Sequence, residues 1–71
     1  MTQRIASDLV ANVALVHVRV GSSVQAGDEV ALLESMKMEI PVVAEEPGTV
    51  TDVRVTPGDV VQEGDVLVVI D

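Results

Sequence analysis

The side chain best suited to chemistry in this 71-residue chain is Lys37, the only lysine, which stands between Met36 and Met38. A lysine amine can accept an acyl group and form an amide. At neutral pH it is almost entirely protonated, so another protein must supply the base. The two methionines offer such a protein soft apolar contacts with little demand on shape. The pattern favours covalent modification of one amine, and a solvated turn lysine is the alternative.

No second constellation of residues indicates catalysis or metal binding. The chain has no cysteine and a single histidine, His17, so neither thiolates nor a histidine cluster can hold a metal ion. The acidic residues show no calcium-loop spacing, and there is no glycine-rich phosphate loop and no convincing Ser-His or Cys-His pair. We therefore expect no catalytic residue, no metal site and no enzymatic activity of the chain's own.

The charge balance excludes several classes of partner. Four basic and twelve acidic residues give a net charge of −8, which argues against nucleic acids and anionic membranes. No apolar run approaches the roughly 18 residues of a membrane span, and the N-terminus leads into no signal-peptide core. We expect a cytoplasmic monomer that binds neither nucleic acid nor membrane.

Composition and periodicity predict an all-β fold. Valine occurs seventeen times and aromatic residues are absent. Valine is β-branched, and its alternation with polar residues over 16–20 and 53–55 is typical of half-buried strands. Glycines beside aspartates punctuate these runs, as turns require. The expected inward-facing valines are Val16, Val18, Val53 and Val55.

An internal repeat organises the chain. Residues 5–34 align with residues 42–71 without a gap, and eight of the thirty pairs are identical. The apolar period breaks between Val13 and Val16 in the first copy and at the equivalent place in the second, which predicts a bulge in both strands. Copies this short cannot each bury a core, so they must pack on each other. We expect a quasi-twofold β-sandwich or flattened β-barrel.

Residues 35–41 connect the two copies. A connection this short between strands is most simply a hairpin, with its tip near Lys37. Strand alternation would place Met36 and Met38 on one face near that tip. The chain is therefore expected to form one domain over residues 1–71, with the lysine at the junction of its halves.

The residues around the lysine resemble the attachment site of biotinyl domains, the biotin carboxyl carrier family, and read Glu34-Ser35-Met36-Lys37-Met38-Glu39. The turn segments 21–28, 47–50 and 57–65 are also similar to the family's, so the resemblance covers nearly the whole chain. It is greatest to very small, free-standing biotinylated proteins. The resemblance implies a flattened barrel of two four-stranded antiparallel sheets. It also implies that Lys37 lies on an exposed hairpin turn and that the termini lie together at the far end.

The same resemblance implies a biotin carrier. A biotin protein ligase would attach biotin to Lys37. The candidate recognition residues for that ligase are Glu34, Ser35, Met36, Met38 and Glu39. The arm would carry carboxylate between the biotin carboxylase and carboxyltransferase subunits of a biotin-dependent carboxylase.

Two other functions remain open on the sequence. Ser35 stands where the family usually has alanine, and related lipoyl domains often have an acid followed by Ser or Thr before their target residues. Lipoyl sites usually have aspartate before the lysine and alanine after it, whereas here both neighbours are methionine. The alternatives are therefore a lipoyl carrier, or an unmodified module whose hairpin binds a partner.

Overall fold

The computed structural model describes residues 2–71, and within them it contains eight strands and no helix. The strands are β1 Gln3–Ala6, β2 Ala11–Val16, β3 Ser23–Val24, β4 Glu29–Ser35, β5 Met38–Val43, β6 Gly48–Val53, β7 Val60–Val61 and β8 Val66–Ile70. Across residues 2–71 no helix is long and apolar enough to cross a membrane.

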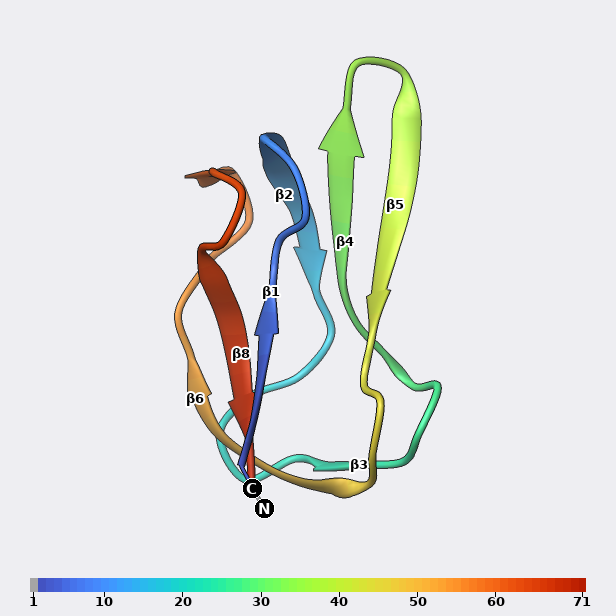
Figure 1. Ribbon diagram of the computed structural model, residues 1–71, viewed down its shortest axis with the longest axis vertical. Helices are drawn as coiled ribbons and strands as arrows, with labels where there is room; N and C mark the ends of the chain where they lie inside the picture. Colours follow the sequence, from blue (N-terminus) through green and yellow to red (C-terminus); the bar gives the residue numbers. More distant parts are fainter. Residues whose placement is uncertain (1) are drawn as a thin grey trace.

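The strands form two four-stranded antiparallel sheets, with strand orders β1-β8-β6-β3 and β5-β4-β2-β7 (Figure 1). The molecule measures 32 × 18 × 17 Å along its principal axes. The predicted all-β class and the predicted pair of four-stranded sheets are both confirmed.

The two sheets are equivalent in topology. β2 and β6 begin 37 residues apart, as do β3 and β7, and each strand of one sheet has its counterpart at the same place in the other. The strand register shifts between Val13 and Leu15 in β2 and between Val50 and Asp52 in β6. The shared break in the apolar period therefore marks a bulge in each copy, as predicted.

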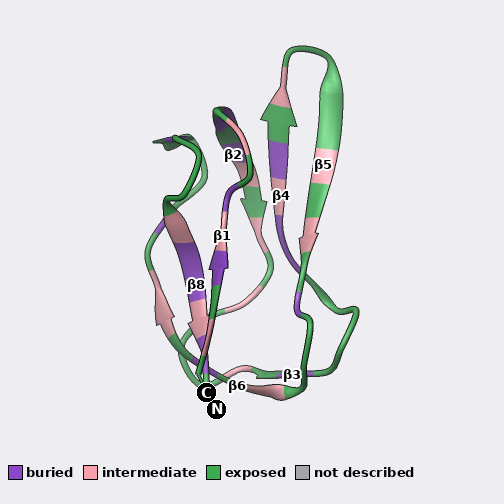
Figure 2. Ribbon diagram, in the orientation of Figure 1, coloured by how far each residue is buried: buried purple, intermediate pink, exposed green. Residues whose placement is uncertain are grey.

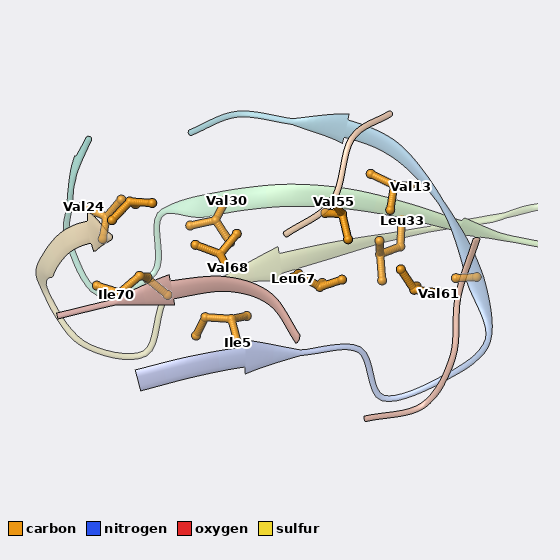
Figure 3. Close-up of a cluster of buried hydrophobic side chains, with 13 residues drawn as sticks. Ile5, Val13, Val24, Val30, Leu33, Val55, Val61, Leu67, Val68 and Ile70 are labelled. Carbon is orange, nitrogen blue, oxygen red and sulfur yellow. The ribbon is translucent and has the colours of Figure 1, made fainter. Parts of the chain in front are cut away.

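The core lies between the sheets and consists of aliphatic side chains from both (Figure 3). Leu33, Leu67 and Ile70 are the largest buried side chains, and the rest of the buried cluster is mainly valine. Buried, half-buried and exposed residues follow one another along the strands (Figure 2). A chain of this size can bury only about 60% of its unfolded surface, which explains so thin a core.

The predicted inward-facing valines are only partly buried. Val55 is buried, whereas Val16, Val18 and Val53 are half-buried and pack against the edge of the core. The reason is their position: Val16 and Val53 end their strands, and Val18 lies in the connection that follows β2. The opposite sheet covers these places incompletely.

The two copies have the same tight turn at equivalent places, after β3 in the first copy and after β7 in the second. In one, the backbone N–H of Gln25 donates to Asp28 Oδ2 at 2.8 Å, and Gly27 has φ = +89°. The counterpart has Asp65 as acceptor and Gly64 with the same φ. Glycine adopts this φ without steric cost, and the aspartate satisfies an N–H left unpaired by the turn. These turns send the chain from one sheet to the other.

The two termini meet at one end of the molecule. Gln3 pairs with Ile70 in the β1–β8 ladder, and the Thr2 hydroxyl donates to Asp71 Oδ1 at 2.9 Å. Figure 1 shows the β4–β5 hairpin rising from the opposite end, beyond the rest of the molecule. The fold thus presents the hairpin far from both chain ends.

Candidate functional site

The β4–β5 hairpin closes with a two-residue turn. Ser35 pairs with Met38, so only Met36 and Lys37 lie outside the ladder. Six cross-strand residue pairs join β4 to β5, from Glu29 at the base of the hairpin to Ser35 at its tip. A short turn on a long, paired ribbon places the lysine at a defined point in space.

Met36 has a left-handed backbone conformation, with φ = 57°, and is the only non-glycine residue in residues 2–71 with a positive φ. A positive φ at only the first of the two turn positions is the pattern of a type II′ turn, which normally has glycine there. The Met36 side chain is 100% exposed. The backbone cost at Met36 is therefore compensated by no contact of its side chain within the described structure.

Lys37 is exposed, and no ion pair or hydrogen bond of its amine is found within residues 2–71. Two carboxylates lie nearby, because Glu34 and Glu39 face each other across the strands one pair below the turn-closing residues. Like charges directly opposite on a sheet repel each other. The amine is thus accessible to another protein, and the strands behind it present negative charge.

Ser35 and Met38 occupy the base of the turn. The Ser35 hydroxyl donates to the Val10 carbonyl oxygen at 3.3 Å, which ties the hairpin to the β1–β2 connection. Nothing in the sequence pattern indicated Val10 as a partner of this site. Met38 begins β5 and is 60% exposed.

Lys37 and the five residues singled out around it lie together on this hairpin. The expectation that Met36 and Met38 share a face by strand alternation does not apply, because Met36 belongs to the turn and only Met38 to a strand. No group of three or more His, Asp or Glu side chains in the described part of the chain is arranged to hold a metal ion. The site is therefore an exposed amine at the tip of two paired strands, with a methionine on each side of it and the carboxylates of Glu34 and Glu39 one pair below the turn.

A family model described as biotin-requiring enzyme, of the biotin/lipoyl group, matches residues 4–70. The chain belongs to the biotin/lipoyl attachment family. As a member, it is a biotin carrier without catalytic activity of its own, and its cofactor is covalently bound biotin. The family resemblance stated from the sequence is confirmed.

Individual relatives agree with this membership. The chain is similar to the biotin/lipoyl attachment protein of Bacillus subtilis, with 55% identity over 56 residues, or 79% of this chain and 77% of the relative. It is 47% identical over 70 residues to the biotinylated protein TB7.3 homolog of Mycobacterium leprae, covering 99% of each. The crystal structure of Kluyveromyces lactis urea carboxylase superposes with a TM-score of 0.92 and 32% identity, over 100% of this chain and 6% of that one.

The biotin carrier's hairpin fits a covalently attached group. Amide formation needs an amine that a second protein can reach, and Lys37 is exposed in a turn that projects from the molecule (Figure 1). Leu33 of β4 is 1% exposed and joins the base of this hairpin to the core. The carrier can therefore receive the group without unfolding any part of its core.

Proposed function

We propose that the Lys37 amine is the attachment point of biotin and that a biotin protein ligase loads it. The observation that carries this proposal is the coincidence of the chain's only lysine with the tip of a two-residue, projecting hairpin turn. Met36 and Met38 supply exposed apolar contacts for the ligase, while Glu34, Ser35 and Glu39 complete its recognition surface.

The loading step is an acyl transfer. The Lys37 nitrogen attacks the carbonyl carbon of an activated biotin acyl group, the new C–N amide bond forms, and the bond to the leaving group breaks. The amine must lose protons in the process, and no side chain within residues 2–71 is hydrogen-bonded to it to accept one. The base therefore comes from the ligase, and the carrier contributes the position of the nucleophile.

Once attached, biotin supplies a ring that takes up and gives up carboxylate. The partners proposed are the biotin carboxylase and carboxyltransferase subunits of a biotin-dependent carboxylase. The likeness to part of a urea carboxylase supports a carboxylase partner. Tethering the group to a carrier makes its delivery effectively intramolecular, so weak docking by a monomeric carrier is sufficient.

Intact-mass measurement after incubation with a biotin protein ligase, biotin and ATP tests the proposal. The wild-type protein gains one biotin, and Lys37→Arg gains none. Acylation removes one positive charge and takes the net charge from −8 to −9, so isoelectric focusing shows an acidic shift. The double variant Lys37→Arg with Arg19→Lys keeps one exposed lysine in the protein but places it outside the hairpin, and it stays unmodified.

Three outcomes would contradict the proposal. Biotin on Lys37→Arg would show that the amine is not the acceptor. Lipoyl in place of biotin, on the protein isolated from its host, would indicate a lipoyl carrier. No modification at all would favour a hairpin that binds its partner directly.

A further inference from the structure

The outer face of the hairpin-bearing sheet carries a row of apolar side chains. Leu15 of β2 pairs with Leu32 of β4, and Leu32 pairs with Pro41 of β5, so the three lie side by side across the sheet. The next residue of β4, Leu33, points into the core and is buried. Because side chains alternate along a strand, the row points outward. We call Leu15, Leu32 and Pro41 the apolar band.

The fold itself does not require the apolar band. The quasi-twofold symmetry gives each of its members a counterpart 37 residues away on the other sheet, where Asp52 pairs with Val69 and Val69 with Arg4. Two of these three counterparts are charged, at positions with the same topology. Leu15 is nonetheless 50% exposed. One sheet thus has exposed apolar side chains at positions where the equivalent sheet has mainly charged ones. Such a difference indicates that the apolar face is a contact surface.

Charge is distributed just as unevenly. On the hairpin-bearing sheet, Glu34 pairs with Glu39 on the side of the apolar band that is nearer the hairpin tip. Glu29 lies on the other side of the band, at the base of the hairpin, opposite Val43. His17 lies next to this face, and its Nε2 is hydrogen-bonded to Glu29 Oε2 at 2.6 Å. None of the described residues paired across this sheet is lysine or arginine.

The opposite face is balanced. It has Arg4 in the β1–β8 ladder, and Arg54 Nε contacts Asp52 Oδ2 at 2.9 Å. The equivalent of Glu34 on this face is Asp71, whose carboxylate accepts a hydrogen bond from Thr2. A partner with positive charge around an apolar strip would therefore distinguish the two faces of this otherwise symmetric molecule.

The area that a specific protein–protein interface buries also indicates that a partner contacts more than the hairpin turn. A standard interface buries about 800 Å² on each partner. The entire protein exposes 4410 Å², so such a contact would cover almost a fifth of it. A two-residue turn cannot supply that area, so a protein that binds Lys37 through an interface of standard size also covers a surface next to the hairpin.

A groove between β1 and β5 is the other surface that adjoins the hairpin. Its lining includes the buried core residues Ile5 and Leu33 and the exposed Val43, and it shares the exposed Pro41 with the apolar band. Arg4, Asp8 and Glu45 also line it, so its charge is mixed. The groove therefore lacks the uniform negative charge of the hairpin-bearing sheet.

We propose that the biotin protein ligase docks on the apolar band and on the carboxylates of Glu29, Glu34 and Glu39, through an apolar strip bordered by Lys and Arg. This inference rests on the proposed function, since the ligase must reach Lys37. A second copy of this chain is a poor occupant, because each copy carries a charge of −8 and the acidic faces would repel each other.

The kinetics of biotin transfer by a purified biotin protein ligase test this docking surface. Leu15→Thr removes an exposed apolar side chain from a strand outside the hairpin and keeps strand propensity. We expect the KM for the carrier to rise about fivefold, from the loss of the exposed half of a leucine, with kcat unchanged. Glu39→Gln also raises KM, and its effect disappears at high salt.

Matched variants separate docking from other causes. Leu32→Thr and Val69→Thr change equivalent half-buried positions on opposite faces. Thermal unfolding measures how far each variant is destabilised. After that destabilisation is taken into account, only Leu32→Thr is expected to raise the KM for the carrier. Glu46→Gln alters the net charge as Glu39→Gln does, but at the chain-end side of the molecule, and leaves KM unchanged. A wild-type protein left unmodified would overturn the proposed function and this inference together. If the wild-type protein is biotinylated and Leu15→Thr has the same KM as the wild type, the inference alone would be overturned.

Discussion

Replacing Met36 with glycine is expected to stabilise the carrier. A non-glycine residue in the left-handed region costs about 1–2 kcal/mol, and Met36 adopts φ = 57°. Glycine removes that cost but gives the unfolded chain more freedom, which offsets about 0.5–1 kcal/mol. No packing is lost, because the Met36 side chain is 100% exposed. The net gain is about 1 kcal/mol, and the unfolding midpoint of a domain of this size then rises by about 4–8 °C.

Thermal unfolding followed by circular dichroism measures this gain. Met36→Ala is the matched control, since it removes the same side chain but keeps a Cβ in the left-handed conformation. Its stability is expected to stay within about 0.5 kcal/mol of the wild type. A lower midpoint for Met36→Gly would refute the reasoning, because it would mean that the turn imposes no backbone cost. Slower biotin transfer to both variants would show that the methionine side chain is retained for the ligase.

Two further substitutions probe the packing that supports the hairpin and the sheets. Gly48→Ala is expected to lower the free energy of unfolding by about 1–3 kcal/mol, measured by urea unfolding. The reason is that a Cβ there would lie 2.7 Å from Ile70 Cγ2 and 2.8 Å from the Asp71 carbonyl oxygen. Unchanged stability would mean that the end of β8 can move aside. Leu33→Ala is expected to cost about 2–5 kcal/mol in the same assay, since Leu33 is 1% exposed, whereas a loss equal to that of Leu15→Ala would contradict its central place in the core.

Much of the fold could be predicted from the sequence because the repeat constrains it. Two gapless copies of a valine-rich segment can bury their apolar faces only against each other, and the matching breaks after Val13 and Val50 fixed the bulges. Burial of individual valines was less predictable. Val16 and Val53 have the same alternation as fully buried residues, but they lie at strand ends where the opposite sheet gives little cover.

The place of the candidate hairpin in the fold was predictable, and its geometry was less so. The position of Lys37 near a hairpin tip followed from the short connector between the copies. The left-handed conformation of Met36 did not, because methionine gives no local signal for a positive φ. The contact from Ser35 to Val10 joins residues 25 apart, and only the folded register of the strands brings them together.

The pairing of Gln3 with Ile70 has a consequence for how such a carrier can be used. Both chain ends lie at the opposite end of the molecule from the β4–β5 hairpin, so a polypeptide joined to either end is attached far from Lys37. The same fold is therefore compatible with a separate small protein or with one domain of a long multienzyme chain, and neither use requires a change in the two sheets.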